Sequence, residues 1–107
     1  MKKFLIKGTY NSEGTKGLMQ EGGSSRKAAI DKMLAAVGGK VESFYYAFGE
    51  HDVLTIVELP DDITAAAVAL RVNAAGLVRI SMTVLISAEE IDEASKKSVN
   101  YRGPGAK

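Results

Sequence analysis

His51 and Asp52 are the residues of this chain whose types are best suited to proton transfer. An imidazole titrates near neutral pH, and a neighbouring carboxylate can orient it and raise its basicity. In an enzyme we would expect His51 to be the catalytic base, with Arg79 or Tyr10 stabilising the developing negative charge. Adjacent residues of a strand point to opposite faces, however. In a second interpretation His51 is therefore a partly exposed hairpin residue and Asp52 caps turn amides.

A glycine-rich stretch, residues 17–24, comes close to a phosphate-binding loop but has Gly23 where that loop requires a lysine. We interpret the stretch as a glycine hinge before a helix capped by Ser24 or Ser25. Two alternatives stay open. One is an anion held at the start of that helix beside Arg26, and the other is a mobile flap over a pocket.

The composition excludes several kinds of site. The chain has no cysteine and a single histidine, which excludes a thiolate nucleophile, a disulfide and a multi-histidine metal site within one subunit. We therefore expect no metal and no cofactor. Fourteen Lys and Arg residues against 13 Asp and Glu residues give a net charge of +1. This balance lacks the basic field of a nucleic-acid binder, so we expect no nucleic-acid partner.

No segment has the length and hydropathy of a targeting or membrane segment. Lys7 ends the first apolar stretch well short of the ~7 to 15 residues of a signal-peptide core. The run 63–70 ends at Arg71, below the ~20 residues that span a bilayer. We expect a cytoplasmic protein without membrane association.

Hydrophobic periodicity predicts four strands separated by helices. The strands are expected over residues 3–10, 40–48, 52–59 and 78–86. Helices are expected over residues 12–21, from the Ser24 or Ser25 cap to Gly38, from the Asp61 or Asp62 cap to about Ala75, and from a Ser87–Glu90 capping box to about Ser98.

This order of elements is typical of an α+β, ferredoxin-like βαββαβ fold with an extra C-terminal helix. Its antiparallel sheet has the strand order 4-1-3-2, with two helices on one face. We expect a single domain over residues 1–99 and an extended tail over 100–107.

The other face of such a sheet is expected to be apolar as well. Val53 and Val57 lie on one face of their strand, and Leu54 and Ile56 lie on the other. A sheet that is apolar on both faces needs a second layer, and the terminal helix is too short and too polar to provide all of it. We expect a second copy of the chain to pack sheet against sheet as a homodimer, with further stacking of dimers left open.

Three stretches resemble a known family: residues 17–24 (GLMQEGGS), 44–52 (FYYAFGEHD) and 96–102 (KKSVNYR). With them the chain resembles, over nearly its whole length, the GYD-domain family of small bacterial proteins. The resemblance implies a dimeric α+β barrel and a family without an established biochemical activity. It places the family's Gly-x-Tyr-Asp signature on Gly49, His51 and Asp52. A role that needs a phenol at position 51 is therefore in doubt.

The expected topology gathers polar residues from distant segments at one edge of the sheet. Besides His51, the candidate ligand-binding residues at this edge are Tyr10, Arg26, Tyr46, Asp52 and Arg79. A few polar groups on apolar walls are typical of a small-ligand site. Arg79, a charge within a strand, needs a carboxylate partner, with Asp52 as the candidate, or a bound anion.

The favoured hypothesis is a homodimeric module that binds a small organic molecule without chemistry. Two alternatives stay open. The first is a cofactor-independent enzyme, because dimeric α+β barrels include small oxygenases and isomerases. The second is a purely structural or protein-interaction domain.

Overall fold

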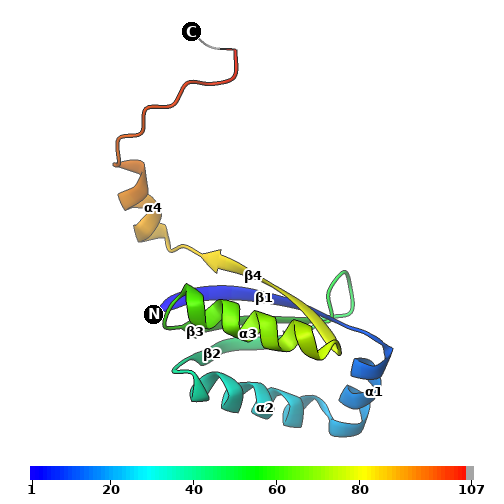
Figure 1. Ribbon diagram of the computed structural model, residues 1–107. Helices are drawn as coiled ribbons and strands as arrows, with labels where there is room; N and C mark the ends of the chain where they lie inside the picture. Colours follow the sequence, from blue (N-terminus) through cyan, green and yellow to red (C-terminus); the bar gives the residue numbers. More distant parts are fainter. Residues whose placement is uncertain (106–107) are drawn as a thin grey trace.

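Four antiparallel strands form one sheet in the order β2-β3-β1-β4 in the computed structural model, which describes residues 1–105 (Figure 1). The strands are β1 (Lys2–Tyr10), β2 (Lys40–Tyr46), β3 (Val53–Leu59) and β4 (Val78–Leu85). Counted from the opposite edge, this order is 4-1-3-2. The α+β ferredoxin-like prediction is therefore confirmed. Residues 106 and 107 of the expected tail lie outside the described residues.

Helices α2 (Gly23–Ala36) and α3 (Asp62–Ala75) lie side by side along one face of the sheet (Figure 1). Helix α1 (Ser12–Glu21) lies at the end of the sheet where β1 stops, and α4 (Ala88–Ser95) follows β4. Among the helices of residues 1–105, none is long and apolar enough to cross a membrane.

Of the four helices within residues 1–105, three begin at a side-chain cap. The Asn11 carboxamide accepts a bond from the Gly14 amide at 2.8 Å, and the Asp61 carboxylate accepts one from the Thr64 amide at 2.8 Å. Ser87 forms the expected capping box before α4. This helix ends at Ser95, earlier than the expected Ser98.

Helix α2 is the exception, because it begins without a side-chain cap. Ser24 and Ser25 lie inside its first turn, so the prediction that one of them caps it was wrong. The turn instead uses Gly22, whose φ of 88° is a conformation that glycine adopts without steric cost. A single residue, Gly22, therefore separates the end of α1 from the start of α2.

The hydrophobic core lies between the sheet and helices α2 and α3. In β3, Val53, Thr55, Val57 and Leu59 are buried and alternate with half-buried residues, as expected for a strand covered mainly on one side. The core cluster comprises Phe4, Ile6, Leu34, Val57, Leu59, Ala65 and Val68. The Thr55 hydroxyl donates to the Ser43 carbonyl at 2.7 Å, so this buried polar group is satisfied.

The far face of the sheet is the one turned away from α2 and α3. The strand register places Leu5 beside Ile56 and Tyr45 beside Leu54 there, opposite the buried valines of β3 as predicted. The same face carries Lys7, paired with Ser81, and is therefore more mixed than the sequence suggested. Helix α4 and the segment after it project away from the sheet and do not cover this face (Figure 1).

Candidate functional site

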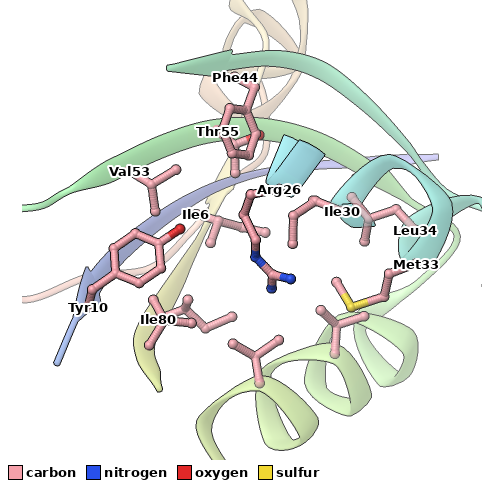
Figure 2. A pocket seen from close by; sticks show the side chains of 13 residues that line it. Ile6, Tyr10, Arg26, Ile30, Met33, Leu34, Phe44, Val53, Thr55 and Ile80 are labelled. Carbon is pink, nitrogen blue, oxygen red and sulfur yellow. The ribbon is translucent and has the colours of Figure 1, made fainter. Parts of the chain in front are cut away.

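A cavity of about 50 Å³ lies between the sheet and helices α2 and α3, at the end of the sheet where β1 stops (Figure 2). The register brings Tyr10 beside Val78 and Tyr46 beside Val53, so this end gathers parts of all four strands. The residues lining the cavity are Ile6, Tyr10, Arg26, Ile30, Met33, Leu34, Phe44, Val53, Thr55, Val68, Val72, Val78 and Ile80. We refer to this space as the inner cavity.

Tyr10 and Arg26 bring strongly polar groups to the inner cavity. Figure 2 shows the Arg26 guanidinium within the ring of aliphatic side chains, with the Tyr10 hydroxyl on the same side of the cavity. Burial raises the pKa of Tyr10, and the nearby positive charge of Arg26 opposes this rise. The phenol therefore stays protonated at neutral pH and keeps its hydroxyl group as a donor.

Tyr46 lies beside this pair but does not line the inner cavity. Its hydroxyl donates to the Gly23 carbonyl at 3.1 Å, and its ring packs edge-on against Phe44 with centroids 5.2 Å apart. Burial raises the pKa of Tyr46, and the nearby Tyr10 raises it further. Tyr46 thus holds the first turn of α2, the turn that carries Arg26.

Asp52 is hydrogen-bonded to the backbone of Tyr10, and not to its side chain. Its carboxylate accepts from the Tyr10 amide at 2.8 Å, and its own amide donates to the Gly8 carbonyl at 2.8 Å. The Asp52 carboxylate therefore caps an amide at the end of β1, and the amides of its own turn, which one of the two interpretations had it cap, do not donate to it within residues 1–105. The expected ion pair with Arg79 is absent among the described residues, so that expectation was wrong.

His51 and Arg79 lie outside the inner cavity. Arg79 is exposed and pairs with Thr9, one residue before Tyr10, so the pleat turns it to the far face. The His51 Nδ1 atom lies 3.4 Å from the Thr9 hydroxyl, which places the imidazole on that side as well. Of the candidate residues, the structure therefore brings Tyr10, Arg26 and Tyr46 together, with Asp52 behind Tyr10.

A second space of about 120 Å³, the outer pocket, lies under helix α1. It is lined by Tyr10, Glu13, Gly14, Gly17, Leu18, Glu21, Arg26, Leu77 and Val78. Tyr10, Arg26 and Val78 line both spaces, so the inner cavity and the outer pocket adjoin at these three side chains.

Helix α1 is held against the start of β4. The Asn11 amide donates to the Leu77 carbonyl at 3.0 Å, and a Cβ on Gly14 would collide with that same carbonyl oxygen. Residues 17–21 belong to this helix, and residues 23 and 24 belong to α2. The glycine-rich stretch is therefore not a phosphate-binding loop.

Sequence reasoning missed the apolar walls of the inner cavity. Ile30 and Met33 lie three residues apart on α2, and this helical spacing is the same for the wall of a cavity and for a filled core. It also missed Asn73, whose side chain accepts from the Ile80 amide at 2.8 Å and ties α3 to β4. No cluster of three acidic or histidine side chains within residues 1–105 could hold a metal ion.

Comparison with protein families shows that residues 4–95 match a family model described as GYD domain. No curated protein and no solved structure matches the chain.

Proposed function

The chain belongs to the GYD-domain family, and we propose that it is a homodimeric module that binds a small organic molecule in the inner cavity. The observation that carries the proposal is the convergence of Arg26 and Tyr10 on a space whose other walls are almost entirely apolar. Apolar walls with a few placed polar groups are the usual make-up of a ligand site.

The size of the two spaces supports a small ligand. A cavity of about 150 Å³ is enough for a benzene ring, and neither the inner cavity (about 50 Å³) nor the outer pocket (about 120 Å³) reaches that volume alone. Because Arg26 and Tyr10 line both spaces, a ligand in contact with them could extend from one space toward the other. The ligand we propose is therefore a molecule with a small apolar body.

The dimer is supported by the pattern of side chains on the far face. Leu5, Leu54 and Ile56 form an apolar centre on adjacent strands. Charges toward the ends of this face are already paired within the subunit, Lys3 with Glu42 at 3.1 Å and Lys40 with Glu58 at 3.4 Å. Lys7 and Arg79 also lie on this face and have no ion pair within residues 1–105, so a second copy that packs sheet against sheet would have to supply partners for them.

Methyl NMR tests the binding proposal. We expect titration with benzene or hexanol to shift the methyl signals of Ile30, Met33 and Ile80 and to leave the signal of Ile63 unchanged, because Ile63 is 82% exposed on α3. Val72→Met, which fills the inner cavity, should weaken these shifts, whereas Ile63→Met on the same helix should not.

Absence of any shift at the cavity methyl groups would contradict the binding proposal and favour a purely structural or protein-interaction domain. Native mass spectrometry of protein purified from its own host provides an independent measurement. It reports the subunit number and any retained small molecule together.

A further inference from the structure

Arg26 is a half-buried cation that lacks a carboxylate partner. None of the ion pairs within residues 1–105 includes it, and the polar group beside it in the inner cavity is the Tyr10 hydroxyl (Figure 2). A guanidinium has five N–H donors, and one tyrosine oxygen cannot satisfy them. A charge taken partly out of water is costly unless an opposite charge meets it.

We infer that the ligand of the inner cavity is a monocarboxylate with a small apolar body, its carboxylate bound by Arg26 and Tyr10. This inference rests on the proposed function and names the class of ligand for the same site. The planar fork of arginine matches two carboxylate oxygens, and the tyrosine hydroxyl supplies a further donor. The hydrocarbon body would lie along Ile30, Met33 and Ile80.

The residues around Arg26 favour a ligand with one negative charge over a ligand with two. Glu13 and Glu21 line the outer pocket together with Arg26, and the Glu13 carboxylate lies 3.5 Å from Lys16. Glu21 lies close enough to Tyr10 and Tyr46 to raise the pKa of both. A second anionic group would face these carboxylates or would have to enter the apolar cavity, and both positions are unfavourable.

Calorimetric titration with three probes of equal chain length tests the inference: hexanoate, hexanamide and adipate. At pH 7 we expect hexanoate to bind at least tenfold more tightly than hexanamide and than adipate. Hexanoate affinity should fall below about pH 5, because the ligand carboxyl group is protonated there while arginine keeps its charge.

Variants test whether Arg26 causes the preference for hexanoate over hexanamide. Arg26→Gln should remove the preference for hexanoate, and Arg26→Lys should restore part of it, because a lysine keeps the charge but not the fork. The matched control is Lys27→Gln, the neighbouring residue on α2, which removes the same charge from an exposed pair with Asp31. That variant should retain the preference. If Arg26→Gln does not fold, the carboxylate inference is still tested by two measurements on the wild-type protein: its relative affinities for the three probes and the pH dependence of its hexanoate affinity.

The outcomes separate the two proposals. Equal affinity for hexanoate and hexanamide would overturn the carboxylate inference and leave small-molecule binding standing. Tighter binding of adipate would overturn the preference for one charge. Failure of all three probes, together with unshifted cavity methyl groups in the benzene titration, would overturn both proposals.

Discussion

The carboxylate of Asp52 accepts a hydrogen bond from the backbone amide of Tyr10 at 2.8 Å. This contact joins the segment before β3 to the last residue of β1, 42 positions away in the sequence. It fixes the backbone from which the Tyr10 ring reaches the inner cavity. The position of a cavity residue therefore depends on a carboxylate that does not line the cavity.

Replacing Asp52 should cost stability. We expect Asp52→Ala to lower the free energy of unfolding by about 1–2 kcal/mol, because it leaves the Tyr10 amide without its charged acceptor. Asp52→Asn keeps an acceptor oxygen and should lose less. Urea denaturation monitored by circular dichroism measures both values. Equal losses in the two variants would show that the hydrogen bond is not the cause.

Two glycines of α1 should respond in opposite ways to alanine. Gly14→Ala places a methyl group against the Leu77 carbonyl and should cost about 1–3 kcal/mol. A methyl group on Gly17 would meet no neighbouring atom within 4 Å, so Gly17→Ala should stabilise the helix by up to about 1 kcal/mol. Thermal unfolding of both variants compares the two positions within one helix. Similar melting temperatures would contradict this account of α1 packing.

Stability should fall at alkaline pH because of the two half-buried phenols, Tyr10 and Tyr46. The pKa values of Tyr10 and Tyr46 are raised in the folded state, so the unfolded chain loses these protons first as the pH rises above about 10. The free energy of unfolding therefore falls as the pH rises through the raised pKa values. Urea titrations from pH 8 to 11 should show a shallower fall in the Tyr10→Phe, Tyr46→Phe double variant. Tyr101→Phe is the control, because Tyr101 is 75% exposed. If Tyr101→Phe made the fall in stability equally shallow, the fall could not be assigned to Tyr10 and Tyr46.

The proposed dimer depends on the far face. Ile56→Asp introduces a charge into the centre of that face and should convert the dimer into a monomer of about half the mass. Ile63→Asp, on the exposed side of α3, should leave the dimer intact. Light scattering with size-exclusion chromatography at micromolar concentration distinguishes these states. A monomeric wild-type protein would contradict the proposal directly.

Replacement of His51 should leave binding in the inner cavity unchanged. The imidazole lies beside Thr9, outside the cavity lining, so His51→Gln should bind hexanoate with wild-type affinity. Calorimetry measures this under the conditions used for the Arg26 variants. A change of tenfold or more would show that the histidine acts on the site from the far face.

The sequence alone was sufficient to predict the order of elements and most of their ends. The predicted caps at Asp61 and Ser87 are local features, because each depends only on residues within one turn of the helix start. Alternation within a strand also predicted that Val53 and Leu54 lie on opposite faces of the sheet.

The tertiary structure decided which polar residues share a site. Tyr10 and Thr9 are neighbours in the chain, but the pleat sends one toward α2 and the other toward Arg79 and His51. The sequence pattern did not settle which way these side chains turn. The sequence also did not predict the inner cavity. Apolar residues on one helix face, such as Ile30 and Met33, have the same spacing whether the space opposite them is filled or open. The inner cavity depends on how elements distant in the sequence pack together, and a local sequence pattern holds no information on that packing.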